Sequence, residues 1–238
     1  MTMHVRGWTT LAEDPVVLVR EYSFGAGRAN AMAVGLPDGK LMLVSPPTSV
    51  PEAELSELGA AGEVIALVAN NGTHHLGLGS ARAAFPRAVT YAAPAAASRI
   101  RSKNEDAGQL ASTDALQSLL GDKVRVLTVD ASKVGDVIVT VRTENGPMLY
   151  ASDFIANIQR LPANPLFRLA FRLTKSGPGL KVFGMFFMFF VKDRKAACDL
   201  LIRELDGQAH TTLVPAHGDV VTRPDLAPTL VSMLRAAR

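Results

Sequence analysis

Three histidines stand where apolar segments of the chain give way to turns. His74 and His75 follow the apolar segment 63–69, and His217 follows the short apolar segment 211–214. Imidazole is the commonest protein ligand for Zn²⁺ and related ions. Strand ends gather at the edges of a sheet, so these positions predict a metal site, provided that the rings meet in space.

The composition is that of a folded protein with a sizeable core. The 238 residues are 48% hydrophobic and 20% charged, and the length suits one larger domain or two small ones. A net charge of +3, with the basic residues dispersed, gives no sign of a nucleic-acid partner. The single cysteine, Cys198, excludes an internal disulfide and fits a reducing, cytoplasmic location. We expect it to be a packed structural thiol.

Membrane insertion is not expected. The N-terminal residues show no basic-then-apolar pattern of a secretory signal. The most apolar run, residues 180–191, contains Lys181 and Gly184. It is also shorter than the roughly 20 residues that a spanning helix needs.

Hydrophobic periodicity and turn residues predict an alternation of strands and helices. The opening is expected to be an antiparallel meander with a turn at residues 25–27, and residues 103–113 are expected to be a loop. Ser49 is the expected N-cap of the first helix. We expect strands at 16–22, 30–35, 40–44, 63–69, 88–92, 124–129, 136–142, 148–151 and 211–214. We expect helices at 50–58, 77–85, 94–102, 193–205 and 228–238.

Two strand-rich halves, each with interleaved helices, predict an α+β fold in the form of a four-layer sandwich of sheets and helices. Residues 161–192 form a block rich in Phe, Met and basic residues. The plain interpretation is a helical insertion that packs on the domain. The alternatives are a lid, a homodimer surface or a segment lying on a membrane, and we expect a lid or dimer contact rather than membrane contact.

The order of these features resembles the metallo-β-lactamase superfamily over most of the chain. The similarity lies in the opening meander, the strand leading to His74 and His75, the hairpin ending in Asp153 and the strand ending in His217. The superfamily signature is T-H-x-H-x-D-H-x-G, followed by a distant His, a distant Asp and a final His. The resemblance implies one domain over residues 1–238 with an αββα fold and a two-metal site between the sheets.

The chain departs from that signature at the first metal position. Asn70 and Gly72 stand where the first two histidines belong, and Ser132 is the nearest counterpart of the third. Amide and hydroxyl oxygens are weak ligands for Zn²⁺, so we expect this position to bind no ion. Such a degenerate motif resembles a divergent branch of the superfamily in which paired histidines replace the full pattern.

The second metal position is retained. His75 and His217 fall on histidine positions, Asp153 falls on the metal-bridging aspartate, and His74 replaces the aspartate of the signature. The resemblance thus implies one divalent ion, Zn with Fe or Mn as alternatives, held by His74, His75, Asp153 and His217. Two other interpretations remain: His74 orients another group, or Asp153 caps a helix over residues 154–159.

We expect a metal-dependent hydrolase acting on a small-molecule ester, amide or phosphoester. A single ion would lower the pKa of water towards neutrality, while Asp153 or His74 orients that water or serves as general base. The alternative is a non-catalytic protein that uses the same fold for binding or assembly. A di-iron redox enzyme ranks last, because it needs both metal positions.

Overall fold

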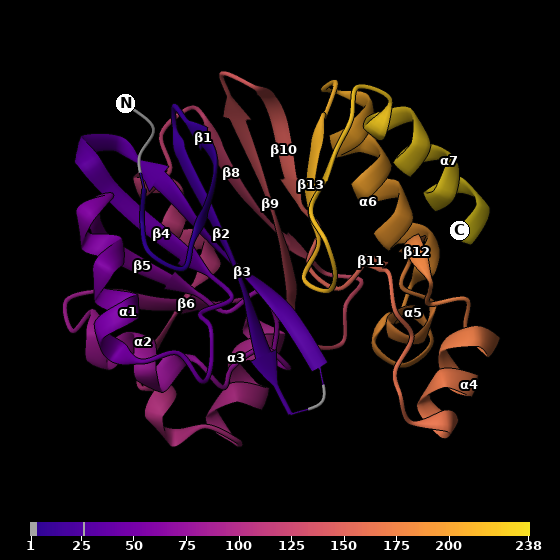
Figure 1. Ribbon diagram of the computed structural model, residues 1–238, viewed down its shortest axis with the longest axis horizontal. Coiled ribbons are helices and arrows are strands. Elements are labelled where there is room, and N and C mark those ends of the chain that lie inside the picture. The colour runs from indigo at the N-terminus through magenta and orange to yellow at the C-terminus, as the bar shows by residue number, and fades with distance from the viewer. Residues whose placement is uncertain (1–3, 26) are drawn as a thin grey trace.

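The computed structural model describes residues 4–25 and 27–238. Two large β-sheets face each other at the centre, and helices lie on the outer sides of both (Figure 1). Ala26, part of the turn expected at residues 25–27, lies outside the described residues. The predicted four-layer α+β sandwich is confirmed.

The first sheet has seven strands in sequence order. β1 to β4 are antiparallel to one another, and β4 to β7 are parallel. The parallel strands send their C-terminal ends to one edge, where the chain continues from β5 towards His74. The strands are β1 (Thr9–Glu13), β2 (Val16–Phe24), β3 (Gly27–Leu36), β4 (Lys40–Val44), β5 (Glu63–Val68), β6 (Val89–Ala92) and β7 (Leu110–Ser112).

The second sheet has five strands in the order β14-β13-β10-β9-β8. β10 and β13 are parallel neighbours, so the residues that follow them emerge at the same edge. The strands are β8 (Val124–Val129), β9 (Asp136–Thr143), β10 (Gly146–Tyr150), β13 (Thr212–Val214) and β14 (Val221–Thr222). A separate antiparallel pair is formed by β11 (Ile155–Ile158) and β12 (Gly179–Val182).

Alternating side chains of each sheet are buried on opposite faces, which explains the layers. Val17 and Val19 of β2 enter the core between the sheets, while Leu18 enters the core beneath the outer helices. A third core lies between the second sheet and its helices. The helices are α1 (Glu52–Ser56), α2 (Leu78–Ala84), α3 (Pro94–Arg101), α4 (Pro165–Leu173), α5 (Gly184–Phe190), α6 (Arg194–Asp206) and α7 (Leu226–Ala237).

Three local predictions are wrong. Ser49 does not cap α1, which begins after Pro51 without a side-chain cap; Ser49 has a left-handed φ of 58°. Residues 154–159 form strand β11 rather than a helix, so Asp153 caps no helix. The expected loop 103–113 contains β7, because pairing with β6 stabilises a strand too short to be recognised from its own residues.

The block at residues 161–192 forms α4, β12 and α5, which lie together at one end of the molecule (Figure 1). Its buried side is anchored by Phe171, Phe183, Phe186 and Phe187. Cys198 of α6 is fully buried in the same core, and burial raises the pKa of its thiol to about 11, as expected of a structural cysteine. Within the described residues, no helix has the length and hydropathy needed to cross a bilayer.

Candidate metal centre

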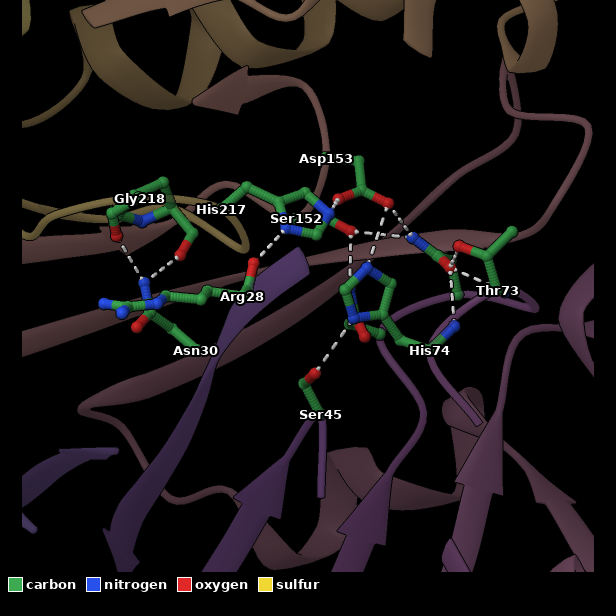
Figure 2. Close-up of polar contacts among 12 residues, drawn as sticks. Arg28, Asn30, Ser45, Thr73, His74, Ser152, Asp153, His217 and Gly218 are labelled. Carbon is green, nitrogen blue, oxygen red and sulfur yellow. Dashed lines mark hydrogen bonds and ion pairs between the residues drawn. The ribbon is translucent and has the colours of Figure 1, made fainter. Parts of the chain in front are cut away.

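Three side chains from three strand ends converge at the edge between the two sheets. His74 follows β5, Asp153 follows β10, and His217 follows β13 (Figure 2). One potential ligand atom from each lies within 4.8 Å of the others. The parallel pairing of β10 and β13 brings Asp153 and His217 to the same edge, and the facing sheet brings His74.

The carboxylate of Asp153 lies between the two rings. Nε2 of His217 is 3.1 Å from Oδ1 of Asp153, and Nε2 of His74 is 3.4 Å from Oδ2. The ring centroids of His74 and His217 are 5.1 Å apart, with their planes inclined by 48°. Both Nε2 atoms thus face the carboxylate from different directions, as the ligands of a single cation do.

The His217 ring has a defined tautomer in its neutral form. Its Nδ1 donates a hydrogen bond of 2.7 Å to the carbonyl oxygen of Arg28, which can only accept. Nε2 of the neutral ring therefore carries a lone pair that faces the Asp153 carboxylate. Such a juxtaposition is favourable only with a proton or a cation between the two groups. Burial alone would lower the pKa of His217, but Asp153 and the Arg28 carbonyl raise it overall.

The loop that carries His217 is held on both sides by asparagines. Asn30 Nδ2 donates to the carbonyl oxygens of Pro215 and Gly218, at 2.8 and 2.7 Å. Asn157 of β11 donates from its backbone N–H to the carbonyl of His217 at 3.0 Å. Gly218 has a φ of 94°, and a Cβ there would lie 2.1 Å from the carbonyl oxygen of Asn157. Only glycine fits this turn.

The His74 ring is held from behind by two hydroxyl groups. Its Nδ1 lies 3.4 Å from both Tyr22 Oη and Ser45 Oγ. Burial is the main cause that raises the pKa of Tyr22 to about 12, so this phenol stays neutral near pH 7. Ser45 directly follows β4 and has a left-handed φ of 52°. These contacts leave Nε2 of His74 directed at Asp153.

Asp153 is buried, with 4% of its surface exposed, and its two oxygens are unequal. Oδ2 accepts a hydrogen bond of 2.8 Å from Asn71 Nδ2, whereas Oδ1 accepts no well-formed hydrogen bond in the described part of the chain. Burial raises the pKa of Asp153, but His74 and His217 together hold it well below its usual range. A buried carboxylate with an imidazole nitrogen beside each oxygen, and no well-formed hydrogen bond on Oδ1, fits a divalent cation.

His75 does not join this group. It is not among the three residues whose ligand atoms meet, although the signature places it on a histidine position. Its ring is buried beside Arg99 and Lys103; burial and these cations lower its pKa. Adjacent residues of a turn direct their side chains differently, so only one member of the pair reaches Asp153. Three of the four expected ligands therefore meet, and His75 is not among them.

The residues at the first metal position are engaged in hydrogen bonds instead. Asn70 Nδ2 donates to Ser152 Oγ at 3.0 Å, and Ser132 Oγ donates to Asp136 Oδ2 at 2.5 Å. Gly72 N donates to the carbonyl of Val134 at 2.8 Å. The side chains of Asn70 and Ser132 and the backbone N–H of Gly72 are thus engaged with other protein groups.

Asp136 is the centre of that network and was not singled out from the sequence. It is fully buried at the start of β9 and accepts hydrogen bonds on Oδ1 from Ser152 Oγ (2.6 Å) and Asn71 Nδ2 (2.8 Å). Burial and the nearby Asp153 raise its pKa to about 7, against the effect of its donors. A lone Asp that opens an apolar strand reads as an ordinary turn residue, so no sequence signal identified it.

Solved structures of similar shape were found across almost the whole chain. A metallo-β-lactamase, FIM-1 from Pseudomonas aeruginosa in its mono-zinc form, has a TM-score of 0.59 at 13% identity, covering 97% of this chain and 95% of that one. The enzyme from Pontibacter korlensis has a TM-score of 0.58 at 12% identity, covering 96% and 98%. The chain has the metallo-β-lactamase fold. The identities are low, as expected for a divergent sequence.

A flavodiiron core also matches. Metal-soaked Flv1 from Synechocystis sp. PCC6803 has a TM-score of 0.59 at 14% identity, covering 96% of this chain and 60% of that one. No protein-family model and no curated protein matches the sequence. The similarity therefore defines the fold and not the chemistry, which depends on the side chains of the site.

Proposed function

We propose that the protein is a metal-dependent hydrolase in which His74, Asp153 and His217 hold one divalent cation. The observation that carries this proposal is the convergence of three ligand atoms within 4.8 Å of one another. Two imidazoles and one carboxylate leave a coordination position open on a tetrahedral ion, which is typical of catalytic rather than structural metal sites. Zn suits this donor set best, and Fe or Mn would also fit.

A cation bound there would act as a Lewis acid and lower the pKa of the water that it binds. The residues of the chain orient the site. The Arg28 carbonyl fixes one imidazole, the hydroxyls of Tyr22 and Ser45 hold the other, and Asn71 fixes the carboxylate. Since the ligands are preorganised in this way, little order has to be gained when the ion binds.

Asp153 is better suited to binding and positioning than to removing a proton. Its pKa is held well below the usual range by the two imidazoles, which makes the carboxylate a weak base near pH 7. His74 uses its only free nitrogen towards the same site. We therefore assign both residues to the ligand shell rather than to general base catalysis.

The substrate class follows from the single retained position. With hydrogen-bonded Asn70 and Ser132 in place of the first ligand set, a second ion to polarise a carbonyl group is not expected. β-Lactams are thus poor candidates. Activated carboxylic esters and phosphoesters of small molecules are the substrates that we propose to screen.

The paired histidines provide an internal control for the test. His74→Gln removes a ligand, whereas His75→Gln changes the adjacent ring that lies outside the cluster. We expect wild-type protein and His75→Gln to bind about one Zn²⁺ per chain with similar affinity, and His74→Gln and His217→Ala to bind at least about tenfold more weakly. Ester and phosphodiester hydrolysis should follow metal content. Equal metal binding by all four proteins would contradict the proposed site.

The alternative, a non-catalytic protein with this fold, is favoured by the hydrogen-bonded network at the first metal position. This alternative predicts that the wild-type protein binds zinc, that His217→Ala abolishes the binding, and that the zinc-loaded wild type still hydrolyses none of the screened substrates. Measured turnover that disappears in His217→Ala and persists in His75→Gln would exclude this alternative.

A further inference from the structure

The end of the molecule formed by α4, β12 and α5 exposes an unusual number of apolar side chains. Of the eight large apolar residues that are exposed in the described part of the chain, six lie in this segment. Leu166 and Leu173 are 75% and 74% exposed. The six are Leu166, Phe167, Leu169, Leu173, Met188 and Phe189. Exposed apolar residues gathered in this way mark a surface that contacts something else.

Helix α4 directs an apolar face away from the protein. Leu166, Leu169 and Leu173 are spaced i, i+3 and i+7, so they share one face of the helix, and each is more than half exposed. Phe171, the one buried residue of the helix, packs into the core. The helix therefore has two apolar sides, one of which is used for folding.

The same segment is strongly basic. Between Phe154 and Lys192 the chain carries no Asp or Glu, although the whole chain has 22 acidic and 25 basic residues. None of the basic side chains in this stretch forms an ion pair with any described carboxylate. They are Arg160, Arg168, Arg172, Lys175, Lys181 and Lys192. The remainder of the protein has a net negative charge.

We propose that this surface, α4 with the exposed part of α5, docks on an anionic lipid surface. Apolar side chains flanked by unpaired basic residues are the pattern of helices that lie in a membrane interface, where the apolar face enters the acyl boundary and the cations meet lipid phosphates. The proposal departs from the expectation of a lid or dimer contact. A symmetric dimer through this face would set two uniformly basic segments against each other, which like-charge repulsion opposes.

The surface also adjoins the candidate metal centre. The ring of Phe183, which lies between β12 and α5, is 5.9 Å from the ring of His217 and 5.7 Å from that of Phe171 in α4. One row of aromatic contacts thus connects the docking helix to the site. If the proposed hydrolase activity holds, the docked protein would take its substrates from the lipid surface. The docking proposal itself requires no activity.

The test is co-sedimentation of the full chain with phosphatidylcholine vesicles, with and without about 30% phosphatidylglycerol. We expect binding to the anionic vesicles that weakens as NaCl is raised from about 0.05 to about 0.5 M. Arg168→Gln with Arg172→Gln should weaken binding about 30-fold, since each basic group near the surface contributes about a fivefold factor. Leu166→Ser, Leu169→Ser and Leu173→Ser combined should weaken it more than about 100-fold.

A charge-matched control replaces Arg87 and Arg101, exposed residues outside the segment, with Gln and should bind like the wild type. All variants alter exposed residues, so circular dichroism should show unchanged folding. Equal binding to neutral and anionic vesicles, or no binding to either, would overturn the proposal. A dimer in light scattering that the leucine variant dissociates, without vesicle binding, would assign the face to a second copy instead.

Discussion

Asp136 and Asp153, two buried carboxylates, share one donor: the side-chain amide nitrogen of Asn71 lies 2.8 Å from an oxygen of each. Their environments differ. Asp153 faces two imidazoles, which keep it ionised, whereas Asp136 has only neutral hydrogen-bond donors and a neighbouring negative charge. One carboxylate is thereby suited to bind a cation and the other to hold a proton near neutral pH.

The protonation of Asp136 predicts a loss of stability as pH rises. Its pKa is about 7 in the folded protein, above the unfolded value of about 3.9. The protonated Asp136 therefore contributes its full share of the free energy of unfolding below about pH 4. This contribution is lost as the pH rises to about 7, by on the order of 1 kcal/mol per pH unit. Asp136→Asn should remove this loss. Urea unfolding at several pH values measures this loss of stability. Parallel pH profiles for the wild type and Asp136→Asn would contradict the role of Asp136.

Metal affinity should rise with pH through the neutral range. Asp153 raises the pKa of His217, and a proton on Nε2 competes with the ion. Below that pKa we expect about a tenfold gain in affinity per pH unit, because binding releases one proton. Competition with a chromophoric chelator from about pH 6 to about pH 8 tests this. An affinity that does not change over the range would refute it.

In the metal-free protein, the stability contributed by the His217–Asp153 ion pair should be lost at both high and low pH. The raised pKa of His217 stabilises the folded protein fully below about pH 6.5, and this stabilisation is lost as the pH rises through the folded pKa. The lowered pKa of Asp153 stabilises the folded protein above about pH 3.9, and this stabilisation is lost as the pH falls through the folded pKa. Between those values the ion pair is complete. His217→Gln should reduce thermal stability most in that window, and a uniform loss at every pH would speak against the pair.

Gly218→Ala should damage both stability and metal binding. The new Cβ would meet the carbonyl oxygen of Asn157 at 2.1 Å, in a residue with a φ of 94°. We expect destabilisation of at least about 2 kcal/mol, with displacement of the His217 ring. Gly39→Ala is the control, because Gly39 also has a positive φ but nothing lies near its Cβ position. Equal effects of the two substitutions would show that the close contact is unimportant.

Tyr22→Phe should weaken metal binding without disturbing the fold. The phenol lies 3.4 Å from Nδ1 of His74 and 3.2 Å from Ser45 Oγ, so its removal loosens the ring but leaves Ser45 as a partner. We expect a loss of affinity of up to about tenfold, measured by zinc titration. Phe24, whose ring also contacts His74, is the control: Phe24→Leu removes a ring contact but no hydrogen bond. A larger effect from Phe24→Leu would assign the orientation to packing.

The sequence predicted most of the sandwich and brought attention to the three side chains that meet at its edge, because both depend on regular patterns. His74, Asp153 and His217 follow apolar strands, and strand ends meet at sheet edges. His75 could not be separated from His74, since the direction of a side chain in a turn depends on backbone angles that residue types do not specify. Asp136 was missed because its partners come from distant segments. The four residues of β11 carry too little periodicity to distinguish a strand from the predicted helix.

The hydrogen bonds that join Asp136 to Asn71, Ser132 and Ser152 have a consequence for how the protein would respond to metal supply. Together with the backbone bonds from Gly72 to Val134 and from Val137 to Asn70, these contacts join the segments that follow β5 and β10 to the start of β9 at the first metal position. The arrangement of these strand ends thus depends on hydrogen bonds within the protein rather than on a bound ion. Removal of the metal by a chelator should therefore abolish activity but leave the fold intact, so that the protein can bind and release the metal repeatedly.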